Sequence, residues 1–257
     1  MKVIAIYNIK GGVGKTAAAV NVAYAAAKEK NNVLLVDMDP QAASTFYLTV
    51  KEDKDDKKAK ALPDSKNLEN LIKETAYEHL DLLPADTRYR QLDSYISDMK
   101  NGDKWLRKIL KPIKKQYDYI IIDCPPNITA LSENILKNSD AVLVPVIPTV
   151  LSVRTYEQLR KFFIEEKLDH KKLFPFFSMV ERRKSMHLDT IEAFSGMHPE
   201  CLKISIPYNA EVEKMGEYMA PIVWRYPYAE ASENFVKLWK KIKQKVNWEA
   251  LSETRRK

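Results

Sequence analysis

The chain has 257 residues, enough for one large α/β domain, and its 45% hydrophobic and 30% charged residues are typical of a globular protein. Its two cysteines, Cys124 and Cys201, lie far apart, which argues against a disulfide framework or a zinc site, and no apolar stretch approaches the roughly 18 residues of a membrane-spanning helix. The net charge of +7 is concentrated near the C-terminus and suggests a polyanionic partner, either nucleic acid or acidic lipid.

Short apolar runs alternate with helical patterns along the chain. The predicted strands span residues 2–8, 32–39, 80–86, 117–126, 140–148, 172–180 and 202–208. Their near-continuous Val, Ile and Leu content favours strands buried on both faces. The predicted helices span residues 16–30, 87–99, 103–116, 129–138, 152–167, 186–195 and 230–247. This order predicts an α/β fold with a doubly wound, mostly parallel sheet, helices on both faces and ligands at the carboxyl ends of the strands.

Two segments differ from this pattern, and neither indicates a domain boundary within residues 1–257. Residues 51–66, KEDKDDKKAKALPDSK, are almost wholly charged and lack an apolar period, so we expect an exposed insertion. Residues 230–257 form a basic C-terminal helix and tail. We therefore expect a single domain with one charged insertion.

Residues 9–16, IKGGVGKT, depart from the usual phosphate-binding pattern G-x-x-x-x-G-K-[ST]. The position of the first glycine is Ile9, and the next residue is an additional lysine, Lys10. The motif still follows a predicted strand and precedes a predicted helix, which is the context a phosphate site needs. Because the motif begins at residue 9, we expect no cleaved signal peptide and a cytoplasmic location.

The remaining motif residues have the chemistry of a nucleotide site. Gly11, Gly12 and Gly14 allow backbone N–H groups to converge on phosphate oxygens at a helix N-terminus. Lys15 would reach the outer phosphates, and the Thr16 hydroxyl would bind Mg²⁺. The predicted nucleotide-binding loop consists of Lys10, Gly11, Gly12, Val13, Gly14, Lys15, Thr16 and Ala17.

Acidic residues end two of the predicted strands. YIIID ends in Asp123, where a carboxylate can hold magnesium through a water. LLVDMDPQ carries Asp37 and Asp39, and a strand period of two would put both carboxylates on one face, which is costly unless a cation or a water network lies there. A turn initiated by Asp39 and Pro40 explains only one member of that pair.

Together, KGGVGKT, VNVAYAAAKE, VLLVDMDPQ and YDYIIIDCPP resemble the deviant Walker motifs of the ParA/MinD family of partitioning and positioning ATPases, closest to the ParA branch. LLPAD, DAVLVPVIPTVLSVRTYEQL and the final Trp-bearing helix fall where that family has counterparts. The resemblance therefore spans nearly the whole chain and implies a P-loop NTPase fold of the deviant Walker A type.

The resemblance also implies an Mg²⁺-dependent ATPase that forms an ATP-dependent sandwich homodimer. Lys10 would reach the phosphates of the ATP held by the other subunit, and Asp39 would help to position the attacking water. The implied catalytic residues are Lys10, Lys15 and Asp39, and the implied magnesium site is Thr16, Asp37 and Asp123, with Asp123 as the Walker B carboxylate.

The resemblance places the adenine base near Ser178 and Met179 and near Pro207 and Tyr208, although no amide-bearing residue marks the first stretch. One departure from the family lies in the second stretch. Many ParA-like proteins have IPRNxRLSEA there, with arginines that contribute to DNA contacts, whereas this chain has IPYNAEVEKM, with Tyr208 and Glu211 at those places. Any DNA binding must therefore rest on other residues.

The segment ENFVKLWKKIKQKVNW fits two structures. Its apolar residues recur at helical spacing with lysines opposite, as in a membrane-surface helix or in a closing helix docked on the core. We favour the docked helix, with no stable membrane insertion, which makes its lysines a candidate phosphate-contact surface. The apolar residues are Phe235, Leu238, Trp239, Ile242 and Val246, and the candidate DNA-contacting lysines are Lys237, Lys240 and Lys241.

A second basic cluster, Arg182, Arg183 and Lys184, follows a predicted strand. It could contact DNA, a partner or the nucleotide, and it could equally be a set of solvated charges at a helix start. No helix-turn-helix precedes the phosphate motif, so any DNA contact of this chain should be non-specific.

The leading hypothesis is a cytoplasmic, nucleoid-associated ATPase that binds non-specific DNA as a dimer and is released when an adaptor of ParB-like role stimulates hydrolysis. Its cargo would be a plasmid, a chromosome or a protein assembly such as a carboxysome. A MinD-like membrane ATPase is the main alternative. An iron–sulfur reductase would need a cysteine pair that Cys124 and Cys201 do not match, and a bacterial tyrosine kinase would need a tyrosine-rich tail.

Overall fold

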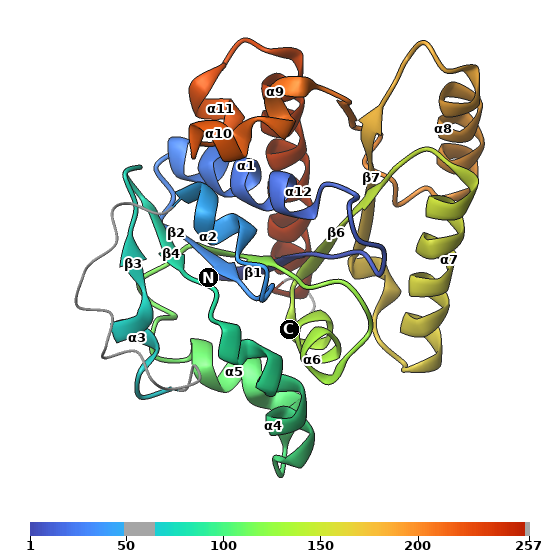
Figure 1. The fold of residues 1–257 in the computed structure, drawn as a ribbon. Coiled ribbons are helices and arrows are strands. Elements are labelled where there is room, and N and C mark those ends of the chain that lie inside the picture. The colour runs from blue at the N-terminus through green and yellow to red at the C-terminus, as the bar shows by residue number, and fades with distance from the viewer. Residues whose placement is uncertain (49–64, 255–257) are drawn as a thin grey trace.

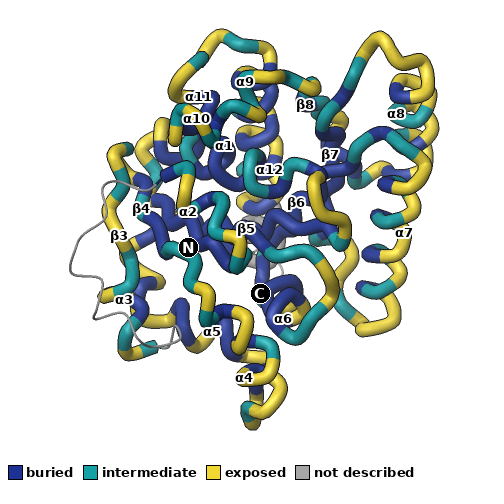
Figure 2. The backbone as a smooth tube through the Cα atoms, in the orientation of Figure 1, coloured by how far each residue is buried: buried dark blue, intermediate teal, exposed yellow. Residues whose placement is uncertain are grey.

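The computed structural model describes residues 1–48 and 65–254, with side chains through residue 247. Helices cover both faces of a central sheet (Figure 1). Figure 2 shows that buried backbone is concentrated in the sheet, while exposed backbone lies on the outer helices. The expected charged insertion, residues 51–66, falls outside the described residues except for its last two.

Within the described residues the sheet has eight strands in the order β3-β4-β2-β5-β1-β6-β7-β8. Their bounds are β1 Lys2–Ile6, β2 Val33–Asp37, β3 Lys73–Glu74, β4 Leu80–Leu83, β5 Tyr119–Asp123, β6 Ala141–Val146, β7 Leu173–Val180 and β8 Ser205–Pro207. Each neighbouring pair is parallel except β3 with β4. The predicted doubly wound, mostly parallel sheet is confirmed, and strand order reverses at β1, where such sheets hold their ligands.

The α-helices are α1 Lys15–Lys28, α2 Ala43–Leu48, α3 Leu68–Leu71, α4 Leu92–Asp98, α5 Trp105–Leu110, α6 Ala130–Asn138, α7 Val150–Glu165, α8 Ser185–Met197, α9 Ala210–Glu213, α10 Met215–Tyr218, α11 Ile222–Arg225 and α12 Glu230–Thr254. The described residues also contain 3₁₀ turns at Thr87–Gln91, Gly102–Lys104 and His170–Lys172. Successive residues of β1 alternate between two hydrophobic clusters, so Val3 packs beneath α4 to α8 and Ile4 packs beneath α1 and α12.

The apolar stripe of α12 packs on the second cluster. Phe235, Leu238, Trp239, Ile242 and Val246 are all buried, and the alanines of α1 let the two helices approach closely. The docked interpretation of this helix is therefore confirmed. No helix within the described ranges has the length and the apolar content needed to cross a bilayer.

Two predicted helices are shorter than their patterns. The segment 87–99 divides into a 3₁₀ turn and α4, and 103–116 divides into a 3₁₀ turn and α5. Helix α5 ends at Leu110 because Pro112 has no N–H to donate to the carbonyl one turn earlier. The sequence patterns missed β3, α2, α3 and α9 to α11, which are all too short to show a period.

We predict that Trp239→Ala lowers the free energy of unfolding by about 3–5 kcal/mol, because it leaves a large cavity between α12 and the sheet. The Trp239 ring is fully buried and meets the edge of Tyr119 at a centroid distance of 4.8 Å. Urea unfolding measures the change, with the exposed Lys245→Ala on the same helix as control. Equal stability of the two variants would contradict the docked position of α12.

Candidate nucleotide site

The loop between β1 and α1 is held by the strands beside it. The Asn8 side chain donates to the Pro145 carbonyl on β6 at 2.8 Å and accepts from the Lys10 N–H at 2.9 Å. The Asn127 N–H, which follows β5, donates to the Ile9 carbonyl at 3.3 Å. The Ile9 side chain packs against the first hydrophobic cluster, so it anchors the loop where the usual motif has glycine.

Glycine is required at the end of this loop. Gly14 is the N-cap of α1 with φ 89°, and a Cβ there would lie 2.8 Å from the Ser178 hydroxyl of β7. Gly12 also has a positive φ, 69°, in the range that favours glycine. Strand β7 therefore lies close against the loop, and the first N–H groups of α1, which have no partner within the helix, are available to an anion.

The two lysines of the loop have different environments. Lys15 is buried, and its ammonium donates to the Lys10 carbonyl at 3.2 Å. Burial lowers the pKa of Lys15, while the nearby Asp123 raises it. The Lys10 side chain is exposed. The loop thus keeps one cation inside the site and presents the other to the surroundings.

Two buried carboxylates stand side by side at the carboxyl ends of β2 and β5. Asp37 is directly opposite Asp123 in the parallel register, and both side chains are almost wholly buried. Burial raises the pKa of each carboxyl, and the charge of Asp37 raises that of Asp123 further. Such a pair is destabilising unless a cation lies beside it.

Asp123 has the free oxygen that a cation would need. Its Oδ1 is buried without a hydrogen-bond partner among the described residues, while the Thr16 hydroxyl is close enough to lower its pKa. Oxygen ligands of this kind suit Mg²⁺. The structure therefore brings Asp37, Asp123 and the Thr16 hydroxyl to one place, and the donor set fits the metal that the sequence led us to expect.

Hydroxyls from α2 hold both carboxylates, and sequence reasoning missed them. Ser44 Oγ donates to Asp123 Oδ2 at 2.7 Å. The N–H and the hydroxyl of Thr45 both donate to Asp37 Oδ2 at 2.8 Å, and the Thr45 hydroxyl accepts from the Ala85 N–H at 2.8 Å. The available signal was the Ser-Thr pair shortly after DMDPQ, but its meaning depends on the fold of α2 against the strand ends.

Asp39 lies beyond the strand, on the partly exposed rim of the site. Strand β2 ends at Asp37, so the predicted strand period does not extend to Asp39, and the two carboxylates differ in burial. The Asp39 N–H donates to Asp37 Oδ1 at 3.2 Å, and Asp39 Oδ1 accepts from the Gln41 N–H at 2.9 Å. The turn at Asp39 and Pro40 explains this placement.

The residues predicted to hold the base gather at the same edge of the sheet. Ser178 and Met179 lie against Gly14 at the end of β7. Pro207 ends β8, and the Tyr208 N–H donates to the Val180 carbonyl at 3.0 Å. The half-exposed Tyr208 hydroxyl donates to Glu213 Oε1 at 2.8 Å, which leaves its ring at the surface.

The predicted DNA-contacting residues form two exposed groups, several of whose charges are paired. Arg182, after β7, pairs with Glu230 at the start of α12. Lys184 pairs with Glu181 at 2.6 Å. On α12, Lys237 lies 3.8 Å from Glu233. Arg183, Lys240 and Lys241 are also exposed.

Comparison with known sequences gives a consistent result. A family model described as an AAA domain matches residues 1–173. The sporulation initiation inhibitor protein Soj of Bacillus subtilis is 30% identical over 247 residues, which cover 94% of this chain and 98% of that protein. The chromosome partitioning protein ParA of Myxococcus xanthus is 28% identical and is matched over 94% of this chain and 87% of its own length.

Solved structures share the fold over nearly the full chain. A complex of McdA from Cyanothece with ATP has a TM-score of 0.75 at 20% identity and covers 94% of this chain and 96% of that one. A putative plasmid partition protein from Borrelia burgdorferi bound to AMPPNP has a TM-score of 0.77 at 21% identity, with 95% and 99% covered. The cell division ATPase MinD of Pyrococcus furiosus has a TM-score of 0.73 at 20% identity, with 95% and 98% covered.

We predict that Asp123→Asn stabilises the ligand-free protein, because it removes one of two adjacent buried charges and keeps the bond from Ser44. The melting temperature should rise by at least about 2 °C. The same variant should lose the further rise that Mg²⁺ and ATP produce in the wild type. Thermal unfolding with and without Mg²⁺ and ATP measures both effects, with the exposed Asp189→Asn as control. A variant that melts below the wild type and still responds to Mg²⁺ would contradict the charge argument.

A second prediction concerns Ala42, which has a left-handed φ of 57° beside Asp39. Because that conformation costs a non-glycine residue roughly 1–2 kcal/mol, Ala42→Gly should raise the free energy of unfolding by about 0.5 kcal/mol. Ala43→Gly, one residue later in α2, should lower it by about 0.5–1 kcal/mol. Urea unfolding measures both, and changes of the same sign would contradict the strain at Ala42.

Proposed function

Because the chain belongs to the ParA/MinD family of P-loop ATPases, closest to its ParA branch, we propose that it hydrolyses ATP as a sandwich homodimer that binds non-specific DNA. An adaptor of ParB-like role would stimulate hydrolysis and so release the dimer from the nucleoid. The cargo would be a plasmid, a chromosome or a protein assembly such as a carboxysome. The observation that carries the ATPase assignment is the buried Asp37 and Asp123 pair, with its unpartnered Oδ1, beside the phosphate loop.

Each residue of the site has a role that fits phosphoryl transfer. Bound Mg²⁺ would neutralise phosphate charge and polarise the outer phosphate. The loop N–H groups and the Lys15 ammonium would bind and orient the phosphates. Asp39, on the solvent rim, would accept a hydrogen bond from the attacking water and align it, while Ser44 and Thr45 hold Asp123 and Asp37 in place.

The surface around the loop supports a second copy of the chain as partner. Val150 and Leu151 follow β6 and are 74% and 66% exposed, and Ile128 follows β5 and is 38% exposed. These apolar side chains lie on segments that follow β5 and β6, the two neighbours of β1, at the edge of the sheet that carries the exposed Lys10. A face-to-face dimer would bury these side chains and bring Lys10 to the partner's phosphates. Dimerisation would therefore supply the second cation that stabilises the transition state.

The position of α12 supports DNA over lipid as the surface that the dimer binds. Its apolar stripe is buried against α1, so up to residue 247 the side of the helix that faces outward carries mainly lysines and other polar residues. Membrane insertion of the MinD-like type would require this stripe to leave the core, at the loss of its burial free energy. Contacts through Lys237, Lys240 and Lys241 would be sequence-independent and sensitive to salt.

We predict that Lys10→Ala retains ATP binding by the monomer but does not dimerise, and that its steady-state ATPase rate falls at least tenfold, by analogy with other cations supplied in trans (about 10³ or more). Lys15→Ala should lose ATP binding itself, because its ammonium lies inside the site. Sedimentation and ATPase assays with Mg²⁺ and ATP measure these effects, with the exposed Lys161→Ala on α7 as control.

The same variants test the DNA switch. Wild-type protein should bind duplex DNA with ATP and release it with ADP or without nucleotide, and Lys10→Ala should bind in none of these states. Equal wild-type binding in all three states would contradict the switch. Binding to anionic vesicles in place of DNA would support the MinD-like alternative.

A further inference from the structure

A second, denser row of positive charge lies on the crossover between β4 and β5. Between residues 104 and 115, each exposed residue is a lysine or an arginine except Pro112, and the segment contains no acidic residue. We call this row the α5 stripe. Its members are Lys104, Arg107, Lys108, Lys111, Lys114 and Lys115.

The inner side of the segment is apolar and buried, so its cations all face outward. Arg107 and Lys108 lie on α5, Lys104 precedes the helix, and the other three lysines lie in the turns that follow Leu110. Six exposed cations on twelve consecutive residues are suited to contacts with several neighbouring phosphates. The residues that hold the segment on the core are Trp105, Leu106, Ile109, Leu110 and Ile113.

The charges of the stripe have no partners of their own in the described residues, although many other surface cations do. Of the acids that flank the segment, Asp103 pairs with Lys137 at 3.4 Å, and Glu69 accepts a hydrogen bond from the Gln116 amide at 2.9 Å. Neighbouring like charges repel one another. Among the described residues no acidic side chain forms an ion pair with the stripe, so a bound polyanion would relieve this repulsion.

The chemistry of the stripe selects among polyanions. It exposes no apolar side chain except Pro112, so nothing would insert between lipid chains. It exposes no aromatic ring on which the bases of a single strand could stack. A group of exposed cations without apolar or aromatic side chains suits the phosphate backbone of a duplex.

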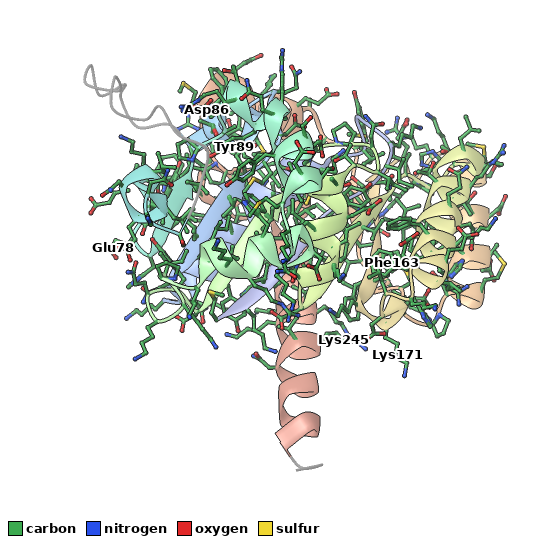
Figure 3. The ribbon with its side chains drawn as sticks, turned by 90° about the horizontal axis from the view of Figure 1, so that it is seen from below. Glu78, Asp86, Tyr89, Phe163, Lys171 and Lys245 are labelled. Carbon is green, nitrogen blue, oxygen red and sulfur yellow. The ribbon has the colours of Figure 1, made fainter. Side chains whose placement is uncertain are left out.

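We propose that the α5 stripe is a second contact surface for the backbone of duplex DNA. The inference rests on the proposed function, because it assumes that the dimer binds DNA, and it places part of that contact outside α12. Helix α5 packs on the hydrophobic cluster on the opposite side of the sheet from α12. Figure 3, seen from below, looks onto the layer of α4, α5 and α6, whereas α1 lies on the far side of the sheet.

Removing three charges from the stripe tests the proposal. The variant is K108Q/K111Q/K115Q, and its control K28Q/K161Q/K171Q removes the same number of exposed lysines from scattered positions. The probe is a fluorescein-labelled 40-base-pair duplex of arbitrary sequence, titrated by anisotropy with Mg²⁺ and ATP. We expect the stripe variant to bind at least tenfold more weakly than the control, with the slope of log K against log salt reduced by up to roughly 2.7.

Further measurements separate the possible failures. Sedimentation and ATPase assays should show the same ATP-dependent dimer and basal rate in the stripe variant and the wild type. K108R/K111R/K115R should restore DNA binding, because it restores the charge. If the wild type binds no DNA in any nucleotide state, the proposed function fails. If the wild type binds DNA and the stripe variant binds it as tightly as the control, this inference alone fails. It also fails if the stripe variant binds DNA normally and loses only binding to anionic vesicles or to an acidic protein.

Discussion

The site depends on two carboxylates that the parallel register of β2 and β5 forces together. Because Asp37 and Asp123 end adjacent strands at the same level, their repulsion follows from the topology and cannot be relieved by rotating one side chain away. Ser44 and Thr45 satisfy one oxygen of each carboxylate, but hydroxyls supply no charge. The fold therefore holds two buried charges together whose repulsion Lys15 reduces and a bound metal ion would reduce further.

The rest of the sheet places those cations. Strand β1 lies between β5 and β6, so the loop that follows it emerges beside Asp123, and Asn8 ties that loop to β6. Helix α1 then begins at Lys15, which directs its N-terminus at the same point. Figure 3 shows the two edges of the sheet well separated, with Asp86 near the carboxyl edge and Lys171 near the amino edge. The nucleotide chemistry is thus confined to one edge.

Features that depend on a short stretch of sequence could be predicted, whereas features that depend on tertiary packing could not. Parallel strands buried on both faces are continuous apolar runs in the sequence, which is why all seven predicted strands are present. The glycines and acids of the site could also be recognised, because each lies in a short motif directly after a predicted strand. Ser44 and Thr45 could not be assigned because their role arises from tertiary packing of a six-residue helix. The strand period failed at Asp39 because Pro40 turns the chain there. The pattern at 103–116 predicted a helix, but it could not show that its lysines form no ion pair with the described acids, because that depends on where those acids lie in the fold.

This separation of charges limits how a nucleotide could control DNA binding. The cations of α12 and the α5 stripe lie on segments whose apolar residues are buried on opposite faces of the sheet, so both groups are already present in one subunit. A dimer that closes through Lys10 would double the number of such surfaces in one particle. Because a second contact on the same duplex forms at high effective concentration, affinity would rise far more than twofold without any new contact. In the mechanism we propose, ATP would control DNA affinity through the number of subunits that are joined, and the repulsion between Asp37 and Asp123 would make the metal-bound nucleotide a condition for joining them.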